Sequence, residues 1–237
     1  MYGGYYYYDY SWIILIPAII FTMFAQAKVS RAYKVYSEIR NSTGITGAEA
    51  ARRMMDSNGL SGVDINVLSG GNSLTNYYDP RGKSLNLSQE VYGSSSVSSV
   101  AIACHEVAHA IQDERRYAPL VFRNGIVPVV NLTQMFSWPL IIIGLLMSAA
   151  SPYGSLLFLV GVACFMFVII FHLITLPVEI NASNLALEQM RVLGMCNEED
   201  YVGSRAVLKA AAMTYIAALA TAVASLLRVF LIAGRRR

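Results

Sequence analysis

Four long apolar stretches limit what this chain of 237 residues can fold into. They cover approximately residues 11–27, 127–150, 155–176 and 210–233. At a rise of 1.5 Å per residue, a helix of about 20 apolar residues crosses the roughly 30 Å hydrocarbon core of a bilayer. Apolar residues make up 55% of the chain and charged residues only 14%, which is unusual for a soluble domain. We therefore expect a mainly α-helical membrane protein with about four transmembrane helices.

The residues that flank these stretches indicate how they are connected and oriented. Residues 151–154 alone separate the second and third stretches, which predicts a transmembrane hairpin. Basic residues follow the first stretch and do not precede it, so we expect an uncleaved anchor and not a signal peptide. The basic residues near the span ends fall on one side: Lys28, Arg31, Lys34, Arg115, Arg116, Arg123, Arg191, Arg205 and Lys209. This side is expected to be cytoplasmic, although residues 235–237 would then lie outside, against the rule.

The polar region between the first two spans is large enough for a small α+β domain. It is predicted to hold helices at residues 28–40 and 46–59 and short strands at residues 64–68, 73–78 and 84–88. A Ser-rich loop at 94–99 is expected to cap a third helix that runs through Cys104 to about Arg116. Thr46 and Glu49 form a capping box that opens the second helix. The strands alternate with turn residues, which predicts a short antiparallel sheet.

Charge and cysteine content argue against two other classes of protein. The net charge is only +3, and the basic residues are spread out, so we expect no nucleic-acid partner. The three cysteines form no CxxC pair, which gives no sign of a disulfide framework. The oligomeric state is left open by the sequence.

The segment His105-Glu106-Val107-Ala108-His109 is an HExxH motif within the third predicted helix. Residues four apart share a helix face, so His105 and His109 can direct two imidazoles at one zinc ion. Glu106 is placed to accept a proton from water and not to bind the metal itself. The chain has only three histidines, so this pairing favours a metal site over two incidental helix histidines.

A catalytic zinc site needs a third protein ligand and keeps a fourth position for water. The residues after His109 do not continue into HExxHxxGxxH, which excludes the metzincin arrangement. Glu179 is the best candidate, because the hairpin between it and His109 crosses the membrane twice and returns to the same face. It is expected to open a helix that continues through Glu188. Glu188, Glu198 and Glu199 are rivals that we expect on solvated surface.

Polar residues inside the predicted spans are weaker candidates. His172 precedes Glu179 by about two helical turns, and Tyr215 and Arg228 lie in the last span. We expect hydrogen-bonded burial for His172 and snorkelling for Arg228. No residue is assigned to stabilise an oxyanion.

Taken together, these features resemble the YugP-type membrane zinc metallopeptidases and, more distantly, the HtpX-type and CAAX-prenyl endopeptidases of the gluzincin group. The resemblance covers nearly the whole chain and rests on the anchor, Asn76-Tyr77-Tyr78-Asp79-Pro80, Leu85-Asn86-Leu87-Ser88, the His-Glu-x-x-His-Ala-Ile-Gln helix, the hairpin, Leu176-Pro177-Val178-Glu179, Ala182-Ser183 and the final apolar helix. It implies zinc-dependent endopeptidase activity and Glu179 as the third ligand. The chain departs from the family pattern at Ala108, where Gly is usual, and at Asn181, where Asp is usual. The residues that surround and orient the metal ligands are therefore expected to differ from those of the family.

The sequence thus predicts a membrane-embedded zinc endopeptidase of the cell membrane that acts from the cytoplasmic side on membrane or membrane-proximal proteins. Residues 84–88 are placed for a substrate to add as a strand. The main alternative is a catalytically silent zinc-binding membrane adaptor. Cleavage within the bilayer is disfavoured because residues 112–116 carry charges that are costly in hydrocarbon. The expected parts are a tail and anchor (1–27), a catalytic α+β region (28–126), a transmembrane hairpin (127–176), a third-ligand helix and loop (177–209) and a C-terminal transmembrane helix (210–237).

Overall fold

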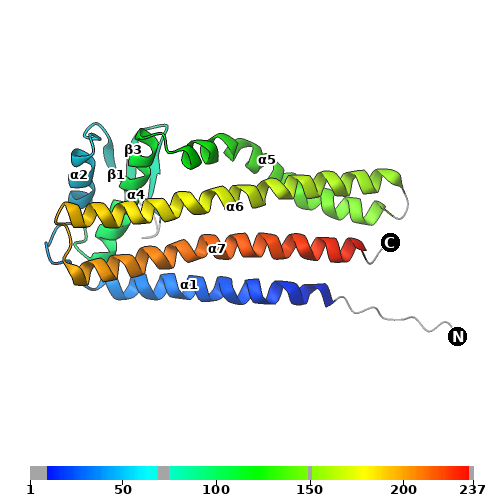
Figure 1. Cartoon of the computed structure of the whole chain (residues 1–237), viewed down its shortest axis with the longest axis horizontal. Coiled ribbons are helices and arrows are strands. Elements are labelled where there is room, and N and C mark those ends of the chain that lie inside the picture. Colours follow the sequence, from blue (N-terminus) through cyan, green and yellow to red (C-terminus); the bar gives the residue numbers. More distant parts are fainter. Residues whose placement is uncertain (1–9, 69–74, 149–150, 235–237) are drawn as a thin grey trace. The chain divides into compact units, whose positions relative to one another are not determined.

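The structure is a computed structural model that describes residues 10–68, 75–148 and 151–234. Its elements are η1 (Tyr10–Ile14), α1 (Leu15–Ser37), α2 (Gly47–Ser57), β1 (Asp64–Leu68), β2 (Tyr77–Asp79), β3 (Ser84–Ser88), α3 (Gln89–Gly93), α4 (Val97–Glu114), α5 (Ala118–Met147), α6 (Pro152–Val192) and α7 (Glu198–Gly234) (Figure 1). The fold is mainly α-helical with one small sheet. The predicted fold class is therefore confirmed in its main features.

The chain divides into two compact units. The helical unit comprises the described parts of Met1–Phe24, Ile126–Leu173 and Ile216–Arg237. The mixed unit comprises Ala25–Gly125 and Ile174–Tyr215. The helical unit therefore draws on the apolar stretches, and the mixed unit contains the HExxH motif.

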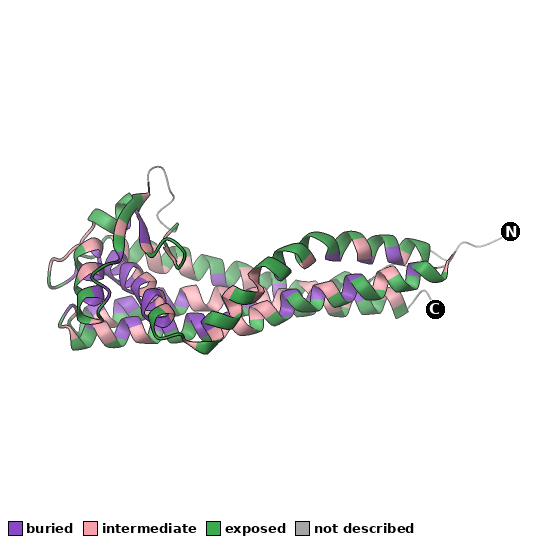
Figure 2. Ribbon diagram, turned by 90° about the horizontal axis from the view of Figure 1, so that it is seen from above, coloured by how far each residue is buried: buried purple, intermediate pink, exposed green. Residues whose placement is uncertain are grey.

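Four helices in the described part of the chain are long and apolar enough to cross a membrane: Tyr10–Ser37, Ala118–Met147, Pro152–Val192 and Glu198–Gly234. Three of them contain a predicted span in full, and Ala118–Met147 covers the predicted span 127–150 up to residue 147. Residues 149 and 150 lie outside the described residues. Only 11–28% of the residues in their most apolar windows are buried, and the exposed and intermediate colours dominate the long helices in Figure 2. Such apolar, outward-facing surfaces suit contact with lipid.

The helices continue further than the sequence predicts. The expected separate helix at 28–40 is the end of α1, which runs without interruption to Ser37. The helix expected to open at Glu179 is also wrong, because α6 continues through Pro177 to Val192. A proline removes one backbone hydrogen bond, and the other bonds of a long helix can hold it together across that position.

The sheet has the strand order β1-β3-β2. β2 pairs antiparallel with β3, but β1 pairs parallel with it, with Asp64 opposite Ser84. The predicted fully antiparallel sheet is therefore wrong. β1 and β3 run in the same direction because the chain direction reverses between β1 and β2 and again between β2 and β3. β1 pairs with β3 along Ser84–Ser88, and β2 pairs with it along 84–86. β3 is therefore the central strand, and the expected addition of a substrate strand is blocked along 84–86.

The second strand is also shorter than expected. The prediction ran from 73 to 78, whereas β2 covers Tyr77–Asp79, and residues 73 and 74 lie outside the described residues.

The core of the mixed unit holds α4 in place. The fully buried side chains include Met54 and Met55 of α2, Leu85 of β3, and Val107 and Ile111 of α4. The α2 start is confirmed, because Thr46 and Glu49 form a complete capping box. Ser96 caps α4 by accepting a hydrogen bond from the Ser99 amide. Caps and core together fix the rotation of α4, and with it the face that carries the two histidines.

Candidate metal centre and active site

Two histidines project from the same face of α4, one helical turn apart. The ring centroids of His105 and His109 are 4.9 Å apart, with the ring planes nearly perpendicular at 84°. The helical geometry of the motif is as the sequence predicts, since residues at i and i+4 lie on one face.

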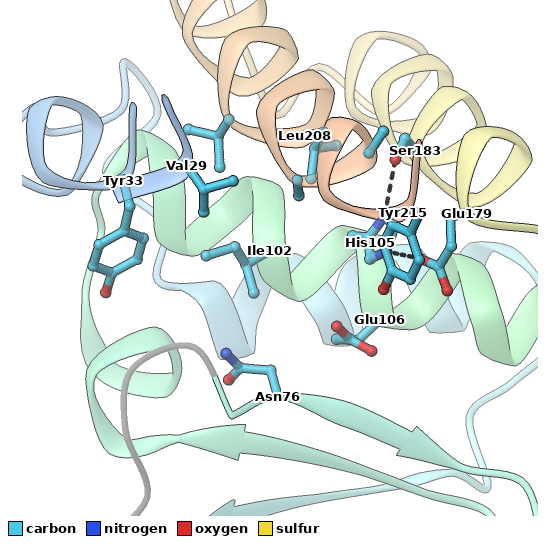
Figure 3. A pocket seen from close by; sticks show the side chains of 13 residues that line it. Val29, Tyr33, Asn76, Ile102, His105, Glu106, Glu179, Ser183, Leu208 and Tyr215 are labelled. Atoms are coloured by element: carbon cyan, nitrogen blue, oxygen red, sulfur yellow. Dashed lines mark hydrogen bonds and ion pairs between the residues drawn. The ribbon is translucent and has the colours of Figure 1, made fainter. Parts of the chain in front are cut away.

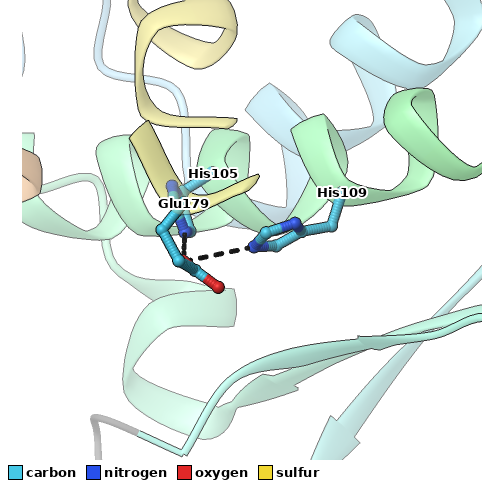
Figure 4. A group of neighbouring side chains, drawn as sticks. All are labelled: His105, His109 and Glu179. Atoms are coloured by element: carbon cyan, nitrogen blue, oxygen red, sulfur yellow. Dashed lines mark hydrogen bonds and ion pairs between the residues drawn. The ribbon is translucent and has the colours of Figure 1, made fainter. Parts of the chain in front are cut away.

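Glu179 of α6 faces both histidines (Figure 4). Its Oε2 lies 3.3 Å from Nε2 of His105 and 3.6 Å from Nε2 of His109. One ligand atom from each of the three residues lies within 4.8 Å of the others. The Glu179 side chain is only 5% exposed. Two residues four apart and a third 70 positions later are thus brought to one point.

Each imidazole also has a hydrogen-bond partner at Nδ1, the ring nitrogen that does not face Glu179. The Ser183 hydroxyl lies 3.3 Å from Nδ1 of His105. Gln112 Oε1 lies 3.0 Å from Nδ1 of His109, and Gln112 Nε2 donates to the Val178 carbonyl at 2.9 Å. Because Nε2 of Gln112 is the donor, its Oε1 accepts from Nδ1–H of His109. This tautomer directs the Nε2 lone pair of His109 toward Glu179.

In this tautomer, the lone pair of His109 Nε2 and the Glu179 carboxylate converge. A neutral imidazole lone pair and a carboxylate oxygen repel each other unless a proton or a metal cation lies between them. Burial lowers the pKa of His109, but the hydrogen bond to Glu179 and the charge of Glu106 raise it by more, so its net shift is upward. Two imidazole nitrogens and one carboxylate form the donor set of a catalytic zinc site with three protein ligands. The residues present fit zinc.

Glu106 lies beside this cluster without joining it. It lines the two cavities that meet at the histidines and, in Figure 3, lies on the Asn76 side of the site. Burial raises the pKa of the Glu106 carboxyl above its usual value, although the charges of His105 and His109 oppose this shift. A carboxylate with a raised pKa is a better proton acceptor near neutral pH.

Comparisons with known proteins identify the group to which this arrangement belongs. Residues 11–234 match the family model described as "Putative neutral zinc metallopeptidase". The chain belongs to this metallopeptidase family. It is 38% identical over 219 residues to "Putative membrane protease YugP" of Bacillus subtilis (strain 168), a match that covers 92% of this chain and 94% of that protein. No solved structure matches the chain. The resemblance to the YugP-type family inferred from the sequence is confirmed.

The rival carboxylates do not belong to the group formed by His105, His109 and Glu179. Glu188, Glu198 and Glu199 are exposed, and Glu198 pairs with Arg191 at 2.7 Å. Among the described residues, the group of potential metal ligands contains His105, His109 and Glu179.

The mixed unit also places two unpredicted side chains at the site. Arg123 Nη1 lies 3.3 Å from Oε1 of Glu179. The Tyr215 hydroxyl interacts with Glu179, and Tyr215 lines both cavities. Tyr215 stood out as a polar residue in an apolar span, whereas Arg123 gave no signal beyond its positive charge. Both side chains carry hydrogen-bond donors and line the cavity that contains His105, His109 and Glu106.

The other two polar residues of the spans are placed elsewhere. His172 packs edge-on against Phe171, with ring centroids 6.1 Å apart. Arg228 Nε donates to the Ser11 hydroxyl at 3.5 Å within the helical unit. Their local partners agree with a structural role for each.

Proposed function

We propose that this member of the family is a zinc-dependent endopeptidase that cleaves membrane or membrane-proximal proteins. The observation that carries the proposal is the convergence of Nε2 of His105, Nε2 of His109 and Oε2 of Glu179, with the Glu106 carboxyl beside them. His105, His109 and Glu179 would hold the metal. A purely structural zinc site would need a fourth protein ligand and no neighbouring base, which favours the enzyme over a silent adaptor.

The chain's own groups have distinct roles in this proposal. When bound, zinc supplies the Lewis acid that polarises the scissile carbonyl and makes water easier to deprotonate. Glu106 accepts a proton from the attacking water and donates it to the leaving amine. Arg123 and Tyr215 donate hydrogen bonds to the substrate oxygen on which negative charge develops. Gln112 and Ser183 keep the imidazoles in orientation.

We propose a cytoplasmic location for this chemistry, on the basic side of a multi-pass membrane protein. Residues 28–126 and 177–209, together with the start of the last helix up to Tyr215, supply the site in this scheme. Residues 1–27, 127–176 and the rest of 210–237 anchor it. The count of Lys and Arg near the span ends supports this orientation.

The proposal is tested with purified protein in detergent. Wild type, Glu106→Gln and Glu114→Gln are loaded to equal zinc content and incubated with casein. Glu114 is exposed at the end of the same helix, so its variant controls for loss of a charge. We expect wild type and Glu114→Gln to cleave and Glu106→Gln to lose at least about 100-fold in rate. Equal cleavage by all three would contradict the role of Glu106, and zinc binding without any cleavage would favour the adaptor.

A further inference from the structure

The cavity on one side of the His105, His109 and Glu179 cluster has an apolar wall. It measures about 200 Å³ and is lined by residues of α1, α4, α6 and α7 and by Asn76, all within the mixed unit. The wall includes Val29, Ile102, Leu208, Ala211 and Ala212. In Figure 3, Val29, Ile102 and Leu208 lie on one side of the cavity and His105 and Glu179 on the other. The apolar wall therefore borders directly on the groups that would act on a peptide bond.

The second cavity has a different character. It also measures about 200 Å³, and its lining includes Tyr78, Arg123 and Asn124. Both cavities share His105 and Glu106. A chain that crosses the site thus meets an apolar pocket on one side of the reacting bond and polar groups on the other.

We propose that the apolar cavity binds one large aliphatic or aromatic side chain of the substrate, next to the scissile bond. This inference rests on the proposed function and names the residue class that the site selects. An apolar cavity of roughly 150 Å³ accommodates benzene, so this cavity has room for the side chain of Leu or Phe. A carboxylate side chain would lose its hydration against this wall and would meet the carboxyl groups of Glu106 and Glu179 in the same cavity.

Two small residues set the size of the pocket. Ala211 and Ala212 contribute only a methyl group each, and both are partly exposed to the cavity. A leucine at either position would occupy the space that the substrate side chain needs. In hydrophobic pockets, a change of one methylene alters selection by about 10-fold or more. The identity of these residues therefore determines specificity.

The experiment uses a polar host peptide with one central variable residue: Leu, Phe, Ala or Asp. Binding is measured by fluorescence anisotropy on full-length zinc-loaded Glu106→Gln, and cleavage is measured on wild type. We expect the Leu and Phe peptides to bind and to be cleaved at least about tenfold better than the Ala and Asp peptides. Ala211→Leu and Ala212→Leu should abolish this advantage. Ala27→Leu, at an exposed position of α1, should keep it.

A further cavity variant keeps the proposal testable if the leucine variants misfold. Ile102→Ala enlarges the same cavity, so it should shift the preference from Leu toward Phe. Equal binding of all four peptides, or an unchanged preference in every cavity variant, would overturn the pocket. Selective binding of Leu and Phe without cleavage by wild type would support the pocket and refute the proposed peptidase.

Discussion

Gln112 Oε1 lies 3.0 Å from Nδ1 of His109. Gln112 also donates to Val178 and Asn181 on α6, so one buried amide joins the motif helix to the helix that carries Glu179. This link fixes both the imidazole tautomer and the distance between the two helices at the site. Hydrogen bonds to a residue that binds a metal change the affinity of the site for that metal.

Loss of the Gln112 contacts should weaken zinc binding. Gln112→Met keeps the length of the side chain but removes its hydrogen bonds, and we expect zinc affinity to fall about 10–100-fold. Competition with a chromogenic chelator measures this change. Gln189→Met on α6 is the control, because Gln189 contacts Asn58 and not a ligand. Equal affinity of the two variants would contradict the role of Gln112.

The Asn181 position should tolerate the residue usual in the family. Asn181 Oδ1 accepts from Gln112 Nε2 at 2.8 Å, and a carboxylate oxygen can accept the same bond. We expect Asn181→Asp to retain zinc affinity and casein cleavage within a few-fold, and Asn181→Leu to lose about 10-fold in affinity. If Asn181→Leu bound zinc like wild type, the contact would be dispensable.

Replacement of Glu179 should remove the metal. Glu179→Gln turns an anionic oxygen into a neutral amide among buried imidazoles, so we expect zinc affinity to fall at least about 100-fold. Glu188→Gln, at an exposed position of the same helix, should leave it unchanged. Metal content after dialysis against a weak chelator distinguishes the two. Retention of zinc by Glu179→Gln would point to a different third ligand.

The protein should lose stability in alkaline solution. Burial and the hydrogen bond to Asp113 raise the pKa of Tyr78 to about 12, and the same carboxylate raises the pKa of Lys83. Both folded-state pKa values lie above their unfolded values, so this contribution is complete below about pH 10 and is lost as pH rises toward 12. Thermal unfolding in detergent between pH 9 and 12 measures it.

The control for this pH dependence is a neighbouring tyrosine. Tyr78→Phe should flatten the decrease in Tm, whereas Tyr77→Phe, at an exposed position, should follow wild type. Parallel curves for all three proteins would contradict the assignment to Tyr78.

The first residue of α2 must remain a glycine. Gly47 is buried, and a Cβ there would overlap the Val91 carbonyl oxygen of α3. We expect Gly47→Ala to destabilise the fold by roughly 1–3 kcal/mol, because backbone atoms must move. Gly62→Ala, where a Cβ meets no neighbour within 4 Å, is the matched control. Equal Tm values for the two variants would show that α2 adapts without cost.

The sequence by itself determined what depends on neighbours along the chain. The apolar stretches predicted the four long helices, Thr46 and Glu49 predicted the start of α2, and the spacing of His105 and His109 predicted two imidazoles on one face. These features follow from helix periodicity, caps and the length needed to cross a bilayer, which are local properties. The choice of Glu179 also came from chain topology, but its role as a ligand stays a prediction.

Only the tertiary structure decided what depends on distant segments. It set the parallel pairing of β1 with β3, the continuation of α6 through Pro177, and the positions of Arg123 and Tyr215 beside Glu179. No local pattern encodes these contacts, because they arise from packing between residues that are tens of positions apart. The two cavities have the same origin, since each is lined by several elements that only the folded core brings together.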